Sequence, residues 1–220
     1  MILLETEANP VPPGAVQVPV TTSDGLSLRA LYWLPAARQA RGTVLLMQGR
    51  AEFVEKYCET VADLLARGFA VAAFDWRGQG GSARSLSDAS KGHVADFSLF
   101  RHDLEAIGTQ LLDPYLPKPF VALAHSMGGC IALTAASEGW LPVDRLIALA
   151  PMVELKMVKH PRTVRMLVRL LSSLGFGDRF VPGGDGRSIS TLGFAGNRLS
   201  SDLPRSVSYT HLTLPTKRIV

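Results

Sequence analysis

The sequence predicts an α/β fold in which helices cover both faces of a mostly parallel sheet. Short apolar runs with the length of buried strands alternate with longer stretches whose apolar residues recur at helical spacing. Hydrophobic residues make up 47% of the 220 residues and charged residues 19%, which suits a sizeable single core and excludes a disordered or fibrous protein. No apolar run approaches the roughly 18 residues that a membrane span needs.

The predicted elements follow one another in a regular order. Residues 16–20 and 26–34 flank the polar turn sequence Ser23-Asp24-Gly25 and predict a hairpin. From residue 43 onward, the alternation of apolar strands with helices favours parallel pairing. Buried strands are expected at 43–47, 70–74, 120–124 and 145–150, and helices at 53–67, at 96–112, directly after Ser126 and at 161–174.

The most informative segment is Leu-Ala-His-Ser-Met-Gly-Gly at 123–129. It follows a predicted strand and opens an Ala-rich helix, which is the context of a nucleophile elbow, a sharp turn that lifts the Ser126 hydroxyl out at the carboxyl end of the sheet. Ala124, Gly128 and Gly129 are small, as the close approach of strand and helix requires, although Ala124 replaces the first glycine of the usual pattern. The alternative is an ordinary strand–turn–helix junction with Ser126 as its N-cap.

A second segment, Gln48-Gly49-Arg50-Ala51-Glu52, directly follows the 43–47 strand. Acyl transfer needs two backbone N–H donors for the developing oxyanion, one after the nucleophile and one from such a loop. The amides of Met127 and Arg50 are the candidates, and Gly49 allows the chain to approach the substrate. The alternative is a plain strand-to-helix turn.

A third segment, Asp-Trp-Arg-Gly-Gln-Gly-Gly-Ser at 75–82, is rich in glycine and also follows a strand. Phosphate binding is disfavoured, because the segment lacks the Lys-[Ser/Thr] of a P-loop and no helix opens directly from it. We expect a structural loop at the rim of the site. Neither a cofactor nor a metal is expected, and the cysteines Cys58 and Cys130 show no spacing of a disulfide framework or metal site.

Together these segments resemble the α/β-hydrolase fold and, within it, serine hydrolases of the lysophospholipase, monoacylglycerol lipase and serine aminopeptidase S33 type. The 49–52 segment with Lys56-Tyr57 is similar to the G-R-x-E…K-Y pattern of bacterial lysophospholipase L2, and less to the H-G-x-x-E of monoacylglycerol lipases. The 75–82 loop resembles D-x-R-G-x-G-x-S. The resemblance covers about residues 20–155 and implies Ser126 as nucleophile with the Arg50 and Met127 amides as oxyanion hole. Gln48 departs from the histidine of many relatives.

The resemblance implies a carboxylic-ester hydrolase that acts on a single-acyl lipid, a lysophospholipid or a monoacylglycerol, through an acyl-enzyme on Ser126. A peptidase or thioesterase is the nearest alternative, since a fold does not fix its substrate. A dehalogenase or epoxide hydrolase is disfavoured, because those enzymes use an aspartate where Ser126 stands. The alternative from another class is a catalytically incomplete fragment of such an enzyme.

The triad partners of Ser126 are not apparent. In this fold an acid and then a histidine follow the serine along the chain. Asp144 precedes its predicted strand instead of following it, and His160 precedes a proline at a helix start, where a capping or exposed role is expected. His125 belongs to the elbow and is expected to support packing. We therefore assign no acid or base and expect both beyond Arg205.

The last residues of the chain are not expected to be native sequence. Residues 207–216 match the conceptual translation of a transposon-type sequencing adaptor, so native sequence is expected to stop near Arg205. Without Lys217 and Arg218 the net charge falls from +4 to +2, and no basic run supports nucleic-acid binding. The expected parts are the N-terminal part of a hydrolase core at 1–154, a partial helical cap at 155–206 and a non-native tail at 207–220, with the C-terminal strands absent.

The predicted helix at 161–174 is amphipathic. Arg162, Arg165 and Arg169 fall opposite its apolar face. One interpretation is a cap helix over the mouth of the site with a solvated basic face. The other is that this face attracts anionic phospholipid headgroups, and the two are compatible. The N-terminus shows no signal peptide, so the expected location is the cytoplasm, with peripheral contact at the inner face of the membrane if the basic face binds lipid.

Overall fold

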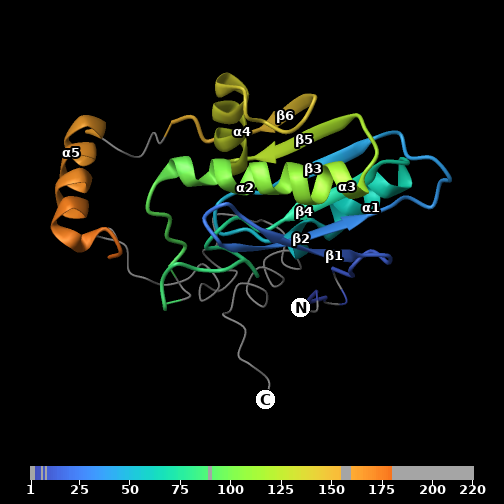
Figure 1. Ribbon diagram of the computed structural model, residues 1–220, viewed down its shortest axis with the longest axis horizontal. Helices are drawn as coiled ribbons and strands as arrows, with labels where there is room; N and C mark the ends of the chain where they lie inside the picture. Colours follow the sequence, from blue (N-terminus) through green and yellow to red (C-terminus); the bar gives the residue numbers. More distant parts are fainter. Residues whose placement is uncertain (1–2, 6, 8, 89–90, 155–159, 180–220) are drawn as a thin grey trace, which may run out of the picture.

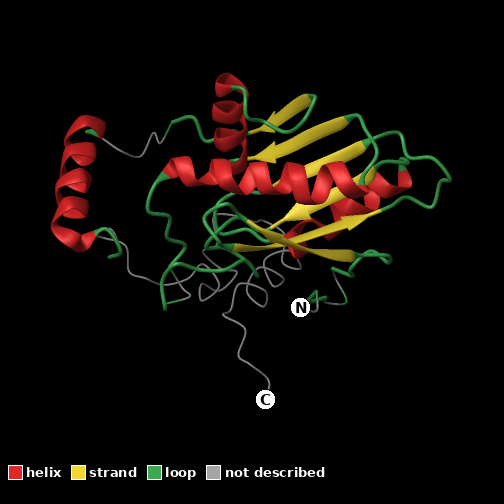
Figure 2. Ribbon diagram, viewed as in Figure 1, coloured by secondary structure: helices red, strands yellow, loops and turns green. Residues whose placement is uncertain are grey.

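A six-stranded sheet forms the centre of the computed structural model, which describes residues 3–5, 7, 9–88, 91–154 and 160–179 (Figures 1 and 2). Its strands are β1 (Val16–Thr21), β2 (Ser27–Trp33), β3 (Thr43–Met47), β4 (Ala70–Phe74), β5 (Phe120–His125) and β6 (Arg145–Leu149). Their order across the sheet is β1-β2-β4-β3-β5-β6. The hairpin of β1 and β2 is antiparallel and β2 pairs antiparallel with β4, whereas β4, β3, β5 and β6 are parallel. The predicted mostly parallel sheet is confirmed.

The helices match the predicted stretches with changes at their ends. The α-helices are α1 (Cys58–Ala66), α2 (Phe100–Ile107), α3 (Asp113–Tyr115), α4 (Met127–Glu138) and α5 (Pro161–Leu171), and the short turns are η1 (Val54–Tyr57), η2 (Phe97–Leu99), η3 (Gly108–Leu112) and η4 (Ser172–Phe176). Asp96 starts the second helical stretch by accepting a 2.8 Å hydrogen bond from the Ser98 amide. The stretch was expected to end at residue 112 but continues through α3 to Tyr115, because Pro114 lies in the first turn of α3, where its missing N–H is not needed.

Alternate residues of the buried strands pack on opposite faces of the sheet. Leu45 of β3 belongs to a core cluster that includes Leu104 of α2 and Ile131 of α4. Leu46, the next residue of β3, belongs to a second cluster that includes Val61 of α1. All five residues of β3 are buried, as the apolar run predicts. The helices on both faces thus clamp the strand that leads into the candidate site.

Strand β6 is less buried than its sequence suggested. The 145–150 run was expected to be buried on both faces, but Ile147 is 51% exposed and Leu149 is 49% exposed. The reason is the position of β6, which is the last strand in the order and, within the described residues, pairs with β5 alone. Its alternate residue Leu146 packs against the α2 and α4 side of the core.

Helix α5 lies apart from the sheet, on the side toward which β5 and β6 point (Figure 1). Residues 162–170 are all exposed, including the apolar Val164, Leu167 and Val168. The cap at 155–206 therefore stays a prediction, and its residues 155–159 and 180–206 lie outside the described part. The tail at 207–220 also lies outside it.

Candidate active site

Ser126 occupies the single position between β5 and α4. Strand β5 ends at His125 and α4 begins at Met127. The turn places Ser126 at φ 51° and ψ −114°, in the left-handed half of the backbone map, which costs a non-glycine residue on the order of 1–3 kcal/mol. Its side chain makes no capping hydrogen bond to α4, so the N-cap alternative does not describe this serine. A strained turn that leaves the hydroxyl unused for structure suits a nucleophile.

The backbone of Ser126 is held by the segment that follows β6. The Ser126 amide donates to the Leu149 carbonyl at 3.1 Å, and the Ser126 carbonyl accepts from the Met152 amide at 3.0 Å. The same carbonyl accepts from the Cys130 amide at 3.1 Å, in the first turn of α4. These three hydrogen bonds stabilise the strained conformation from both sides.

The small residues around Ser126 allow close packing of backbone segments. A Cβ at Gly128 would overlap the Met47 carbonyl and lie 2.6 Å from the Gln48 carbonyl oxygen, and a Cβ at Gly129 would lie 2.9 Å from Cβ of Pro151. Ala124 is fully buried. The first turn of α4 therefore rests directly on the chain leaving β3, as the small residues of the motif predict.

The loop after β3 carries three consecutive backbone amides, and those of the first and third residues donate to buried side chains. The Gly49 amide donates to Oε2 of Glu52 at 2.7 Å, and the Ala51 amide donates to Oε1 of Gln79. Between them, the Arg50 amide makes no hydrogen bond within the described residues, and neither does the Met127 amide at the start of α4. Both amides predicted for the oxyanion hole are thus without a hydrogen-bond partner in the part of the chain that the structure describes.

Glu52 is a buried carboxylate beside the elbow, and the sequence reasoning quoted it only as part of a motif. Besides Gly49, its carboxylate accepts hydrogen bonds from Lys56 and from the Tyr57 hydroxyl at 2.5 Å. Burial alone would raise the pKa of Glu52, but the hydrogen bonds from Lys56 and Tyr57 outweigh it and lower the pKa below its usual value. Glu52 is therefore charged near neutral pH. The sequence signal for Glu52 was that Glu52, Lys56 and Tyr57 have the spacing of the G-R-x-E…K-Y pattern.

His125 faces this carboxylate instead of acting alone as packing support. Its Nδ1 lies 3.3 Å from Oε2 of Glu52, and its side chain is 41% exposed. A Cβ at Gly49 would lie 3.2 Å from the same nitrogen. The residue before Ser126 and the loop after β3 are therefore in direct contact.

The glycine-rich loop at 75–82 folds around its own aspartate. Asp75 is fully buried and accepts hydrogen bonds from the Gly81 amide at 2.7 Å and from Nε of Arg29 at 2.6 Å. Arg29 also binds both oxygens of Glu55, at 2.6 and 2.7 Å. The Gly81 amide and the Arg29 guanidinium, donors that a bound anion would need, are already bound to this internal carboxylate, which favours a structural loop.

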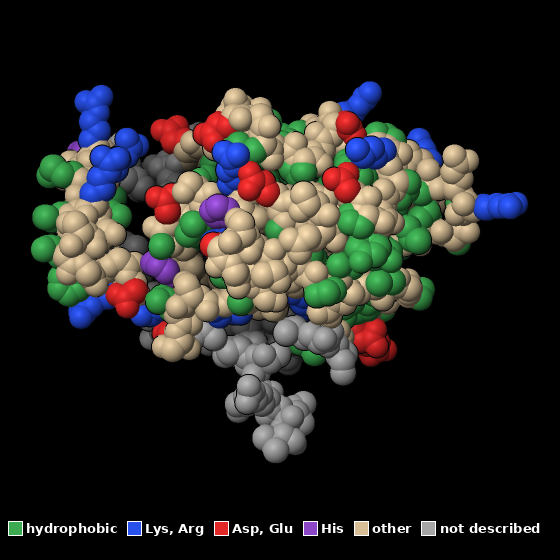
Figure 3. Space-filling view, viewed as in Figure 1, with side chains coloured by type: hydrophobic (Ala, Val, Ile, Leu, Met, Phe, Trp, Pro, Cys, Tyr) green, Lys and Arg blue, Asp and Glu red, His purple; other side chains and the backbone are tan. Residues whose placement is uncertain are grey.

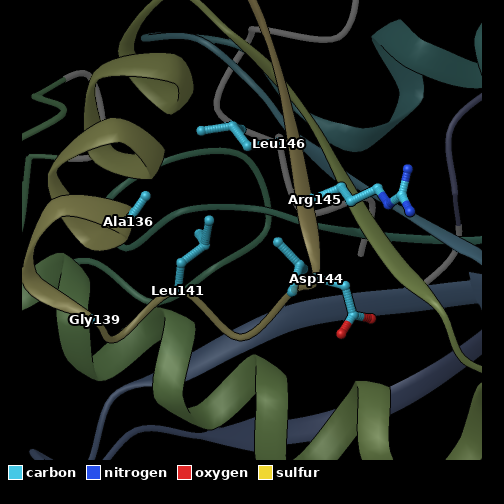
Figure 4. Close-up of a pocket in the computed structure, with 7 residues that line it drawn as sticks. Ala136, Gly139, Leu141, Asp144, Arg145 and Leu146 are labelled. Atoms are coloured by element: carbon cyan, nitrogen blue, oxygen red, sulfur yellow. The ribbon is translucent and has the colours of Figure 1, made fainter.

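The other candidate acid and base lie elsewhere. Oδ2 of Asp144 accepts from the Phe120 amide at 2.8 Å, at the start of β5 and β6 and hence at the opposite end of the sheet from Ser126. His160 precedes α5 without a capping bond. A hollow of about 310 Å³ opens near Asp144, with Leu141 and Leu146 directed into it (Figure 4). It lies between the end of α4 and the start of β6, away from the carboxyl ends of the strands, where ligands bind in open α/β sheets.

Two further features concern the described ranges alone. No group of three or more His, Cys, Asp or Glu side chains in them could hold a metal ion. No helix in them is long and apolar enough to cross a membrane.

Relatives with similar sequences are named as lipid hydrolases. The chain is 31% identical over 143 residues to "Probable lysophospholipase L2" of Haemophilus influenzae, a match that covers 65% of this chain and 45% of that protein. It is 38% identical over 109 residues to Lysophospholipase L2 of Escherichia coli K12, covering 50% and 32%. Monoglyceride lipase of Rattus norvegicus is 28% identical over 134 residues, covering 61% and 42%. The chain thus spans less than half the length of each of these relatives.

Solved structures share the fold at lower identity. A carboxyl esterase from Bacillus coagulans matches with a TM-score of 0.60 and 20% identity, covering 78% of this chain and 55% of that one. An alpha/beta hydrolase from Penicillium sp. sh18 matches with a TM-score of 0.55 and 21% identity, covering 73% and 55%. At these identities the likeness shows the architecture, which is the α/β-hydrolase fold.

Residues 38–191, more than half of the chain, match the family Hydrolase_4, described as serine aminopeptidase, S33. The matched region begins before β3 and includes the loop at 48–52, the glycine-rich loop and the Ser126 turn. With its sheet order, its strained serine and its relatives in agreement, the chain belongs to the Hydrolase_4 (serine aminopeptidase S33) family of α/β-hydrolases.

Proposed function

We propose that the protein is a serine carboxylic-ester hydrolase that acts on a single-acyl lipid, a lysophospholipid or a monoacylglycerol, through an acyl-enzyme on Ser126. The observation that carries the proposal is the strained serine of the Ser126 turn, which has no capping role. Beside it stand the amides of Met127, in the same turn, and of Arg50, in the loop after β3, both without partners in the described residues. Backbone donors that are held in place before the reaction are what an oxyanion requires.

The reaction proceeds in two balanced steps. Oγ of Ser126 bonds to the ester carbonyl carbon, its proton passes to a general base, and the carbonyl oxygen becomes an oxyanion at the Arg50 and Met127 amides. The tetrahedral intermediate expels the glycerol-bearing alcohol, which takes up the proton and leaves an acyl group on Ser126. Water then attacks the acyl carbon, and the fatty acid is released with the serine restored. We assign the base and its acid partner to none of the described residues.

The lipid substrate is supported by the names of the relatives. Two of them are called lysophospholipase L2 and one monoglyceride lipase. The family description favours a second candidate, an aminopeptidase, which would use the same serine and the same amides on an amide bond.

The test uses the protein expressed from its complete natural reading frame. Turnover is compared on lysophosphatidylcholine, a monoacylglycerol and an amino-acid p-nitroanilide, and a fluorophosphonate probe is mapped by peptide mass spectrometry. We expect label on Ser126, turnover of at least one lipid and none of the anilide. Label on another serine would contradict the nucleophile, and turnover of the anilide alone would establish the peptidase.

A membrane contact belongs to the same proposal. Arg162, Arg165 and Arg169 are exposed on α5, beside exposed apolar side chains of the same helix (Figure 3). We infer that this surface meets anionic headgroups and brings the protein to the inner face of the membrane from the cytoplasm.

A further inference from the structure

The peptide groups on either side of Arg50 are fixed by two buried side chains. Glu52, 5% exposed, accepts from the Gly49 amide, and Gln79, 8% exposed, accepts from the Ala51 amide. Ala51 has a φ of 57°, so the loop turns sharply at this point. The one amide of the three that stays available is the Arg50 amide between them.

We propose that Glu52 and Gln79 are positioning residues that hold the oxyanion-hole amide of Arg50 in its productive place. The inference rests on the proposed function, because it takes the Arg50 amide as an oxyanion donor. Such a donor must stay within roughly 0.5 Å of its working position, and backbone in a loop needs supporting bonds to do so.

Both acceptors are themselves immobilised. The Glu52 carboxylate is bound by Lys56 and by the Tyr57 hydroxyl, which lie one helical turn further along the chain. Gln79 lies in a turn closed by two backbone hydrogen bonds of 3.0 Å, from its own amide to the Trp76 carbonyl and from the Ser82 amide to its carbonyl. The loop is therefore attached to η1 through Glu52 and to the glycine-rich loop through Gln79.

Glu52 also joins the loop to the nucleophile turn. Its Oε2 lies 2.7 Å from the Gly49 nitrogen and 3.3 Å from Nδ1 of His125, the residue before Ser126. One carboxylate oxygen thus sets the spacing between the loop with the Arg50 amide and the turn with the Met127 amide. A change at Glu52 should alter the distance between the two halves of the oxyanion hole, and hence affect the transition state more than substrate binding.

The experiment uses the protein from its complete natural reading frame and four variants. Glu52→Leu and Gln79→Leu remove the acceptors, whereas Glu52→Gln and Gln79→Glu keep an oxygen in reach of the amides. We expect the leucine variants to lower kcat for a p-nitrophenyl ester about 10- to 100-fold with little change in KM, and the isosteric variants to retain more of it. Affinity for a boronic-acid transition-state analogue should fall in parallel with kcat.

Several controls separate positioning from general damage. Rates are expressed per active site by fluorophosphonate titration, and thermal melting shows that each variant is folded. Glu105→Gln changes an exposed glutamate of α2, paired with Arg101, and should leave kcat as it is. Leucine variants that match the parent kcat, or that raise KM at unchanged kcat, would overturn the inference while Ser126 remains labelled. Loss of label from Ser126 in the parent protein would instead contradict the proposed function.

Discussion

Ser126 has a backbone conformation that suits glycine better than any other residue. At φ 51° and ψ −114° the Cβ is crowded by its own backbone. An alanine-to-glycine change normally destabilises a protein by about 0.5–1 kcal/mol, since glycine has more freedom to lose on folding. At Ser126 a glycine relieves the backbone strain, so we expect a change to glycine to stabilise the folded protein instead of destabilising it.

We therefore predict that Ser126→Gly is at least as stable as Ser126→Ala, and that its free energy of unfolding is about 1 kcal/mol higher than that of the parent. Both variants should lose hydrolysis. Urea unfolding followed by circular dichroism measures the difference. A Ser126→Gly protein that unfolds at lower urea than Ser126→Ala would show that the turn is not strained.

Single residues of the site differ in how far the sequence revealed them. Ser126, Gly128 and Gly129 lie in one contiguous motif whose chemistry is local, so the sequence sufficed to propose them. Glu52 and Gln79 act through backbone amides, and Gln79 reaches a loop 28 positions earlier in the chain. The Gln79 pairing depends on the folded arrangement, and no spacing rule predicts it.

At the scale of elements, α5 presents three arginines and an exposed apolar face. We predict that replacing Arg162, Arg165 and Arg169 with glutamine weakens binding to anionic vesicles by about 1 kcal/mol per charge at low salt, because each arginine near a charged bilayer contributes about that much. The effect should shrink as salt rises, since screening shortens the range of the attraction. Co-sedimentation with phosphatidylglycerol and phosphatidylcholine vesicles measures it.

A matched variant tests whether the position of the charges matters. Replacing the exposed Arg38, Arg67 and Arg101 with glutamine removes the same charge from other elements. Equal loss of binding in the two triple variants would assign the attraction to net charge, and α5 would then have no special part in it.

Strands were easier to predict than helices. The apolar runs at Thr43–Met47 and Ala70–Phe74 have the observed bounds, because a strand buried on both faces must be apolar throughout. The 96–112 stretch instead divides into η2, α2 and η3. A Cβ at Gly108, where η3 begins, would lie 2.8 Å from Pro142, so this part of the helix is shaped by packing that the local sequence does not show.

At the scale of the whole molecule, buried arginines connect the hairpin to the rest of the fold. Arg77 of the glycine-rich loop binds Asp24 in the β1–β2 turn at 2.8 Å and Asp103 of α2 at 2.7 Å. Arg29 of β2 similarly binds Asp75 and Glu55. The sequence predicted the mostly parallel sheet from its alternation, but these ion pairs join residues up to 53 positions apart, and they follow from the strand order.

Acid should weaken the ion pair between Arg77 and Asp24. The hydrogen bond from Arg77 holds the pKa of Asp24 well below its ordinary 3.8, although burial opposes the shift. A carboxyl with a lower pKa in the folded state stabilises the fold above its unfolded pKa and loses that contribution as the pH falls toward the folded pKa. We predict that Asp24→Asn is less stable than the parent at neutral pH, and that the difference narrows below pH 3.8.

Urea unfolding at several pH values between about 7 and 2 measures this difference. Asp63→Asn is the control, because Asp63 is exposed and pairs only at 3.7 Å with the exposed Arg67. A stability difference for Asp24→Asn that stays constant down to the lowest pH would contradict the linkage.

The hydrogen bonds that Ser126 donates to Leu149 and accepts from Met152 also indicate where the chain can be exchanged. They bind the nucleophile turn to the end of β6, so its geometry is complete by Met152. Segments grafted after this residue from other members of the family leave these hydrogen bonds within the retained part of the chain. Met152 is therefore the natural crossover point for chimeras that keep the nucleophile turn and take the following segments, with the expected acid and base, from another member of the family.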